Sequence, residues 1–165
     1  MVSSHLISIG TTSMRASTFK RLVNLWPPFL VSSIRVLELD DDWRHATVRM
    51  RLRPWNRNYM GVHFGGNLFA MTDPMWMLLL LHRLGKDYYV WDKAGEIDFV
   101  APGKADVFAH FTLEETVVDE IRTAAANGDK VLHWFSVDVA TAEGEIVAHV
   151  RKQVYVRLKP HRREQ

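Results

Sequence analysis

The alternation of apolar and polar residues predicts where the helices and strands of this chain begin and end. Residues 14–26 place apolar side chains at the three- and four-residue spacings of an amphipathic helix, which Pro27 and Pro28 are predicted to end. Two strands are predicted next, over residues 29–39 and 45–53. In the second, apolar residues alternate with threonine and arginine, which is typical of a strand with one buried face.

The longest apolar stretch lies in the middle of the chain. Residues 68–81 are apolar on every side, and this predicts a buried helix. Beyond it the pattern returns to strands, predicted over residues 88–100 and 104–112. Pro102 and Gly103 mark the turn between them.

The last third of the chain predicts one helix followed by two strands. Thr112 and Glu115 have the spacing of a capping box, and the helix that they begin is predicted to stop at Gly128. The two final strands are predicted over residues 130–140 and 145–158.

These elements predict an α+β fold with a single domain. Six mostly antiparallel strands should form a curved sheet wrapped around the long central helix, because only such a wrapping hides every side of an all-apolar helix. The last strand keeps one apolar face, which Lys152 interrupts. We expect the domain over residues 14–159 and a solvated basic tail over residues 160–165. Residues 1–13 are expected to form a disordered arm or to precede an alternative start at Met14.

The composition narrows the class of protein. With 165 residues, 47% of them hydrophobic and 24% charged, the chain fits one well-buried domain. It has no cysteine, which excludes disulfides, thiol nucleophiles and thiolate metal sites. A formal charge of +2, with part of the basic excess in the tail, predicts no nucleic-acid partner. No apolar run approaches the ~20 residues of a membrane span, so we expect a cytoplasmic protein without a membrane partner.

The familiar strong catalytic motifs are missing from the sequence. It has no GxGxxG, GxxxxGK[ST], GxSxG or HExxH pattern. The motifs that would indicate a dinucleotide-binding protein, a P-loop protein, a serine hydrolase or a zinc protease are therefore absent. The 8 histidines are scattered rather than paired at the spacing of metal ligands. We therefore predict no metal site.

One segment, NYMGVHFGGNLFAMTDPMWMLLLL (residues 58–81), sets glycines and polar residues at the head of the apolar run. Gly65 and Gly66 begin the predicted helix, and the free N–H groups of a helix N-terminus attract negative charge. For a carbonyl under attack, the same N–H groups would form an oxyanion hole. Asn58 and His63 can supply further polar contacts.

Asp73 in the same segment has two interpretations. It follows Gly65 by eight positions, which is roughly 12 Å along a helix and too far for both to contact one reacting carbon. Two chains with antiparallel helices about a twofold axis would bring Asp73 of one chain to Gly65 of the other, so this hypothesis requires an oligomer. Alternatively, Asp73 caps a helix that begins at Pro74.

The stretch HFGGNLFAMTD resembles the HGG-containing motif of hot-dog fold acyl-CoA thioesterases of the phenylacetyl-CoA type. In that family, an acidic residue on the central helix follows the glycine pair at the same spacing. Residues 19–159, and above all VWDKAGEIDFVAPGK, resemble a branch of the superfamily filed as a domain of unknown function. The resemblance implies a hot-dog fold, in agreement with the curved sheet and central helix predicted above.

The resemblance also implies roles for individual residues. The Gly65 N–H would polarise the thioester carbonyl, Asn58 would hold the carbonyl or the attacking water, and His63 would complete the turn. Asp73 of the neighbouring subunit would act as general base or nucleophile. Members of the family are usually dimers or dimers of dimers, which agrees with the oligomer that the helix geometry demands.

The substrate that the resemblance implies is an acyl thioester, and acyl-CoA is the expected form. Coenzyme A would enter only as part of the substrate, so no protein-bound cofactor is expected. The residues expected to contact the substrate are Phe64, Gly66, Asn67, Trp76 and Lys93, with Phe69 also beside the acyl chain.

Three differences from the family pattern bear on these roles. Phe64 is inserted between His63 and the glycine pair, and Pro74 directly follows the acidic residue. On the third strand, where relatives often supply a serine or threonine, this chain has the charged pair Asp92 and Lys93. That pair would either contact the substrate or form a salt bridge at a subunit contact.

Two other functions stay open at this point. A non-catalytic acyl-CoA or fatty-acyl binding module on the same fold would use Asp73 only as a helix cap. A dehydratase of 3-hydroxyacyl thioesters would pair His63 with Asp73, although the match to dehydratase motifs is poor.

Overall fold

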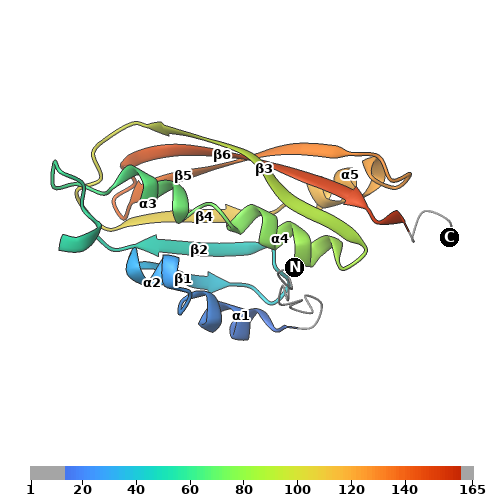
Figure 1. Cartoon of the computed structure of the whole chain (residues 1–165), viewed down its shortest axis with the longest axis horizontal. Helices are drawn as coiled ribbons and strands as arrows, with labels where there is room; N and C mark the ends of the chain where they lie inside the picture. The colour runs from blue at the N-terminus through green and yellow to red at the C-terminus, as the bar shows by residue number, and fades with distance from the viewer. Residues whose placement is uncertain (1–13, 161–165) are drawn as a thin grey trace, which may run out of the picture.

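A computed structural model describes residues 14–160, so the predicted arm over residues 1–13 and the tail beyond Pro160 lie outside the described residues (Figure 1). The helices are α1 (Ala16–Val23), α2 (Pro27–Val31), the 3-10 helix η1 (Pro54–Asn56), α3 (Gly65–Ala70), α4 (Met75–Leu84) and α5 (Glu115–Ala124). The strands are β1 (Ile34–Leu39), β2 (His45–Met50), β3 (Tyr88–Phe99), β4 (Val107–Thr112), β5 (Val131–Thr141) and β6 (Ile146–Leu158).

The strands form one six-stranded antiparallel sheet in the order β1-β2-β4-β5-β6-β3. The sheet curves, and α3 and α4 lie along one of its faces (Figure 1). β3 is an edge strand that pairs only with β6 among the described strands. A curved antiparallel sheet around a central helical segment is the hot-dog fold, and the predicted fold class is confirmed.

The core lies between α4 and the sheet. Met75, Leu79 and Leu80 of α4 are at most 1% exposed. Trp76 stacks on Phe135 of β5, with ring centroids 4.7 Å apart. The buried side chains of β2, β4, β5 and β6 alternate with exposed ones, as the period of a strand requires. Burial of this apolar surface is the main stabilising term of the fold.

The sheet covers only one side of α4. Met77, Leu78 and Leu81 are half-buried, although they are as apolar as the residues that face the sheet. The expectation that every side of the central helix is hidden is therefore wrong within one protomer, because a single sheet can enclose only part of the circumference of a helix.

The central helical segment also contains a break. Residues 71–74 form turns between α3 and α4, so the predicted continuous helix over residues 68–81 is two helices. The hydroxyl of Thr72 donates to the carbonyl of Phe69 at 2.8 Å, and Pro74 occupies the N-cap position of α4. Proline has no N–H for the preceding turn and disfavours a helical residue before it, which explains the break.

The first part of the chain differs from its prediction at the proline pair. α1 ends at Val23, and Pro27 and Pro28 begin α2 instead of ending α1. The predicted strand over residues 29–39 consequently starts only at Ile34. Proline suits the first turn of a helix because the N–H groups there have no helical partner, and burial of the Phe29 side chain anchors this short helix.

The capping box predicted for the last helix is also wrong. Thr112 is the final residue of β4 and pairs with His45 of β2, so α5 begins later, with Glu114 at its N-cap and no side-chain cap. α5 ends at Ala124, four residues before the predicted stop at Gly128. Gly128 closes the turn that follows, with a φ of 79° and its N–H bonded to the carbonyl of Ala125 at 2.9 Å. Sheet pairing outweighs the local capping preference at Thr112.

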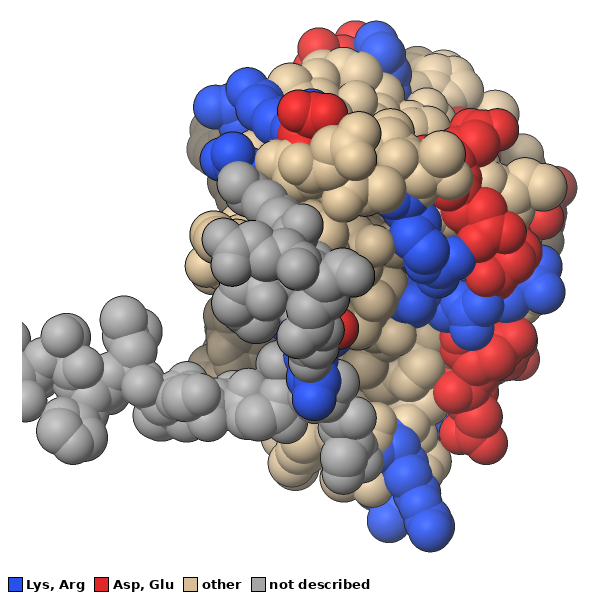
Figure 2. Space-filling model, turned by 90° about the vertical axis from the view of Figure 1, so that its right-hand side faces the viewer, with Lys and Arg blue, Asp and Glu red and all other residues tan. Residues whose placement is uncertain are grey.

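The outer surface is mixed in charge. Lysine and arginine side chains lie next to aspartate and glutamate on the face seen in Figure 2, with uncharged surface between them. None of the helices in residues 14–160 combines the length and the apolar character needed to cross a membrane.

The packing of α4 gives the first prediction. Leu79→Ala is expected to lower the free energy of unfolding by about 2–5 kcal/mol, because it opens a cavity between α4 and the sheet. Urea unfolding followed by tryptophan fluorescence would measure the change. Leu30→Ala is the matched control, since Leu30 is 58% exposed, and it should change stability by at most about 0.5 kcal/mol. Equal losses in the two variants would contradict this description of the core.

Candidate functional site

The loop before α3 is organised by Asn58. Its side-chain oxygen accepts hydrogen bonds from the backbone N–H groups of Met60 and Val62, at 2.9 and 3.3 Å, and its amide nitrogen lies 3.5 Å from the carbonyl of His63. Asn58 therefore closes a local turn of the kind that asparagine favours. In this protomer the Asn58 side chain, predicted to help hold the carbonyl or the attacking water, is engaged by the loop itself.

His63 ties this loop to the segment before β4. It is 2% exposed, its backbone N–H donates to the carbonyl of Gly103, and its Nε2 lies 2.9 Å from the carbonyl of Ala105. Because a carbonyl only accepts, Nε2 carries the ring proton, and the buried Nδ1 has no partner among the described residues. Burial lowers the pKa of the imidazole, while the Ala105 carbonyl and Asp106 oppose that change. His63 is thus a neutral, structural side chain here.

Two glycines begin α3, and aromatic rings occupy the space that larger residues would need. A Cβ at Gly65 would lie 2.7 Å from Cζ of Phe99, and one at Gly66 would lie 2.5 Å from Cε1 of Phe64. Phe64 is the N-cap residue, has extended backbone and supplies no side-chain cap. The N–H of Asn67 donates to the carbonyl of Phe64 at 2.9 Å, which leaves the N–H groups of Gly65 and Gly66 without a partner within the helix.

The other predicted contact residues have different positions. Asn67 accepts a hydrogen bond from the Ser32 hydroxyl at 3.3 Å and so links α3 to α2. Trp76 is packed in the core and borders neither hollow beside α3. Lys93 is exposed at a bulge of β3 and forms no ion pair with any residue between 14 and 160. Phe64 is 54% exposed, which leaves it open to a ligand or a second chain.

Asp73 does not cap α4, so the capping role is wrong, although a new helix does begin at Met75, with Pro74 at its N-cap, close to the start which that interpretation predicted. Its carboxylate accepts a 2.6 Å hydrogen bond from Nζ of Lys152, and α4 has no side-chain cap. The Asp73 side chain is 49% exposed, whereas that of Lys152 is 4% exposed. The carboxylate therefore lies at the surface, and the ammonium group that pairs with it is buried on the side of the sheet.

A second carboxylate reaches the same lysine. Oδ1 of Asp92, on β3, lies 3.7 Å from Nζ of Lys152. The ammonium also lies 5.1 Å from the centre of the Phe69 ring, within the range of a cation–π contact. A Cβ at Gly95 would lie 2.5 Å from Cζ of Phe69 and 3.2 Å from Cδ of Lys152, so a glycine is required there. The predicted charged pair Asp92 and Lys93 is split, because Asp92 points to Lys152.

The surroundings of Asp92 disfavour its charge. Burial raises the pKa of the Asp92 carboxyl to about 6, the Lys152 ammonium opposes this increase, and the negative charge of Asp73 adds to it. Asp92 is therefore expected to take up its proton about two pH units above the ordinary value of 3.8.

Two hollows flank α3, and they divide the candidate residues between them. A hollow of about 660 Å³ is bordered by Gly65 and Phe99, together with Asn58, His63 and Lys104. A smaller one of about 340 Å³ is bordered by Gly66, Phe69 and Asp73, together with Trp26 and Phe29. Gly65 and Asp73 thus face different hollows of one protomer, and no hydrogen bond joins Asp73 to His63 within residues 14–160.

Sequence reasoning missed Lys152 and the role of Asp92. The signal for Lys152 was present, because a lysine stands between Val150 and Val154 on the apolar face of the last strand. A charge at such a position must find a partner, since burying an unpaired ammonium is costly. Its partner could not be read from the sequence, because Asp73 lies 79 positions away along the chain.

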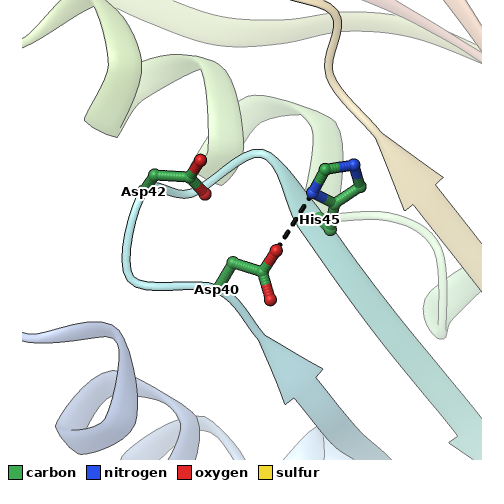
Figure 3. A group of neighbouring side chains, drawn as sticks. All are labelled: Asp40, Asp42 and His45. Atoms are coloured by element: carbon green, nitrogen blue, oxygen red, sulfur yellow. Dashed lines mark hydrogen bonds and ion pairs between the residues drawn. The ribbon is translucent and has the colours of Figure 1, made fainter.

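A further group of polar side chains lies in the β1–β2 hairpin. Oxygen and nitrogen atoms of Asp40, Asp42 and His45 lie within 4.8 Å of one another, and all three residues are exposed (Figure 3). Nδ1 of His45 lies 3.0 Å from the carboxylate of Asp40, and Asp42 accepts the backbone N–H of Arg44. These bonds are those of a tight turn, and we assign the group to closing the hairpin.

The comparison with protein families agrees with this architecture. Residues 15–156 match the family described as Domain of unknown function (DUF4442), and the chain belongs to that family. No curated protein matches the chain.

Several solved structures share the fold. A Pseudomonas aeruginosa protein of unknown function, described as a probable thioesterase, is 20% identical, with a TM-score of 0.80 over 91% of this chain and 100% of its own. A Haemophilus influenzae protein described as a thioesterase is 14% identical, with a TM-score of 0.65 over 88% of this chain and 92% of its own. A Shewanella oneidensis protein described as a putative thioesterase is 17% identical, with a TM-score of 0.61 over 87% and 97%. The predicted resemblance is confirmed at the level of the fold.

The environment of Asp92 gives a prediction about stability. Its folded-state pKa of about 6 lies above the ordinary 3.8, so between these values the folded state binds more protons than the unfolded state. The wild-type protein is therefore expected to lose stability as the pH rises through this window. Asp92→Asn should remove that loss, because the amide mimics the protonated carboxyl. Urea unfolding at several pH values would measure both proteins.

The matched control is Glu96→Gln. Glu96 is on the same strand and pairs with Arg151 of β6 at 3.1 Å, but both side chains of that pair are exposed. This variant should keep the wild-type loss of stability with rising pH. A constant difference in stability between Asp92→Asn and the wild type at every pH would contradict the assignment.

Proposed function

We propose that this protein hydrolyses an acyl thioester, with acyl-CoA as the expected form of the substrate. The observation that carries the proposal is the state of Asp73: a half-exposed carboxylate, paired from below by Lys152, at the edge of an apolar hollow beside α3. Solved proteins described as thioesterases share the fold. A carboxylate next to a site for an apolar group suits attack on an acyl carbonyl.

The proposed chemistry uses Asp73 and the first N–H groups of α3. As general base, Asp73 would take a proton from water while the water oxygen adds to the thioester carbon. As nucleophile, it would add to that carbon itself and form an anhydride that water then cleaves. In both routes the Gly65 N–H would donate to the carbonyl oxygen as negative charge develops on it, and the sulfur would leave as a thiolate. The thiolate would take the proton that Asp73 removed from water in the first route, and a proton from solvent in the second.

The proposal places each site between two subunits. Asp73 and Gly65 border different hollows of one chain, so a second chain is needed to bring such a pair to one carbonyl. Two features support an oligomer: β3 is an edge strand with Trp91 and Phe99 exposed by 64% and 60%, and the outer side of α4 keeps half-buried apolar residues. Exposed apolar surface of this kind is typical of protein–protein contacts.

Each of the two hollows would bind a different part of the substrate. The smaller hollow has Asp73 as its one charged side chain among apolar neighbours that include Trp26, Phe29 and Phe69, which suits an acyl or aryl group. The larger hollow has Lys104 at its border. Lys104, with the exposed Lys93 and Arg57, would offer cations to the phosphates of coenzyme A.

One observation favours a second candidate, a non-catalytic acyl-CoA binding module. Lys152 already compensates the charge of Asp73, and a carboxylate held by an ammonium is a weaker base and nucleophile than a free one. Such a module would bind acyl-CoA tightly without releasing thiol.

The first test of the proposal is Asp73→Asn. Thiol release from short, medium, long and aryl acyl-CoAs is expected to fall by about 10²-fold or more, because the amide can neither accept the proton nor attack. Asp129→Asn is the control, since Asp129 lies in the exposed loop after α5, and it should keep wild-type turnover. Equal turnover in wild type and Asp73→Asn would refute the role of Asp73, and tight binding without turnover in both would favour the binding module.

Gly65 offers a second test through a matched pair of variants. Gly65→Pro removes the N–H, and proline is tolerated there because Gly65 is the first residue of α3 and Phe64 before it is already extended. Gly65→Ala keeps the N–H and adds the same Cβ, which the exposed Phe99 ring must make room for in both variants. The proline variant is expected to lose about 10²–10³-fold more kcat than the alanine variant.

Mixing the two inactive proteins would test the sharing of the site. A dimer with one Asp73→Asn chain and one Gly65→Pro chain keeps one intact site only if each site takes Asp73 and Gly65 from different chains. Random reassembly of equal amounts should then restore about a quarter of the wild-type turnover. Turnover in each separate variant, or none in the mixture despite heterodimers seen by native mass spectrometry, would count against a shared site.

A further inference from the structure

Lys152 is a buried charge on a face of β6 that is otherwise apolar. It lies between Val150 and Val154, and the residue is 3% exposed. A buried ammonium is tolerated in a protein only when nearby groups compensate its charge. A hydrophobic residue of similar size would pack at this position at lower cost, so the lysine requires a reason beyond the packing of the core.

The lysine is compensated by two carboxylates that are unequally placed. Asp73 accepts its hydrogen bond at 2.6 Å from the turn between α3 and α4, and Asp92 lies 3.7 Å away on β3. The Lys152 ammonium is therefore bonded to Asp73 and is within reach of Asp92. With both carboxylates ionised the group carries one net negative charge, and with Asp92 protonated it is neutral.

We propose that Lys152 is a positioning residue that holds the Asp73 carboxylate at the site, and that Asp92 regulates this hold by competing for the same ammonium group. The inference rests on the proposed function of Asp73. When Asp92 is neutral, Lys152 interacts with Asp73 alone and draws its negative charge away from a substrate. When Asp92 is ionised, it takes part of that interaction, and Asp73 becomes a stronger base and nucleophile.

This mechanism predicts that thioester hydrolysis increases as Asp92 loses its proton. Burial raises the pKa of Asp92 to about 6, so the increase falls in a range where most other carboxyl groups are already ionised. Two charged groups face Asp92, and they are Lys152 of β6 and Asp73 of the turn.

Other titratable groups on β3, β6 and α4 near Asp92 are paired elsewhere or exposed to solvent. Arg151 of β6 pairs with Glu96 of β3, and on α4 Arg83 pairs with Glu115 while Nδ1 of His82 lies 2.9 Å from the carbonyl of Leu78. Lys93, the neighbour of Asp92 on β3, is exposed at the bulge. None of these contacts reaches Asp73.

The decisive experiment compares pH profiles of kcat for thiol release. The wild type is expected to show an inflection near pH 6, and Asp92→Asn should lack it and have a kcat about 3–10-fold lower at pH 8. Glu96→Gln is the matched control, because it removes a carboxylate from the same strand whose partner on β6 is exposed Arg151. It should keep the wild-type profile. An inflection that persists unchanged in Asp92→Asn would overturn the inference.

Lys152→Gln tests the positioning role separately. Without the ammonium the Asp73 carboxylate is no longer held in position, and we expect this loss of orientation to outweigh its gain in basicity, so kcat should fall by about tenfold or more. Because Lys152 contacts Asp73 and not the substrate, KM should change by less than about threefold. A folded Lys152→Gln protein with wild-type kcat would overturn the role of the lysine. If this variant does not fold, the profile of Asp92→Asn still decides the inference.

A measurement without substrate separates this inference from the proposed function. In protein labelled with ¹³C at aspartate, the carboxyl resonance of Asp73 should shift in step with the titration of Asp92 near pH 6, and Asp92→Asn should abolish that shift. If no thioester is hydrolysed but the Asp73 resonance still follows the titration of Asp92, the proposed function is refuted, whereas the competition of Asp92 for Lys152 is supported. Independent titrations of the two carboxyls would overturn the regulated hold.

Discussion

The contact between Asp73 and Lys152 is the interaction on which the arrangement of the site depends. An ammonium group that is almost fully buried has to be compensated, and the carboxylates that compensate it come from the turn between α3 and α4 and from β3. The ion pair therefore attaches the break in the central helical segment to the sheet below. It also explains why Asp73 is half-exposed at the surface instead of being used as a cap for α4.

A second constraint comes from aromatic rings packed against glycine backbone. Phe99 and Phe64 occupy the space above Gly65 and Gly66, and Phe69 rests on Gly95 beside Lys152. These contacts place α3 between two hollows, with Gly65 at one and with Gly66 and Asp73 at the other. The packing of α3 thus separates Gly65 from Asp73 within one chain, which is the structural basis for the two-subunit site that we propose.

Much of the fold could be predicted from the pattern of residues, because strand alternation and helix periodicity are local properties. β2 and β6 follow the sequence closely, and α5 ends at Ala124, shortly before the predicted stop at Gly128. The failures occurred where a longer-range contact competes with a local preference. Thr112 pairs with His45 in the sheet instead of capping α5, and the proline pair begins α2 because Phe29 can be buried there.

The sequence by itself determined the class of fold and marked Gly65, Gly66 and Asp73 as unusual in an apolar run, since these depend on the order of neighbouring residues. Only the tertiary structure decided which group Asp73 pairs with, because its partner Lys152 lies 79 positions away and the third member, Asp92, lies on another strand. Whether two charges can pair depends on the distance between them in space. The sequence does not give that distance, because it is set by the pairing of β3 with β6 in the folded sheet.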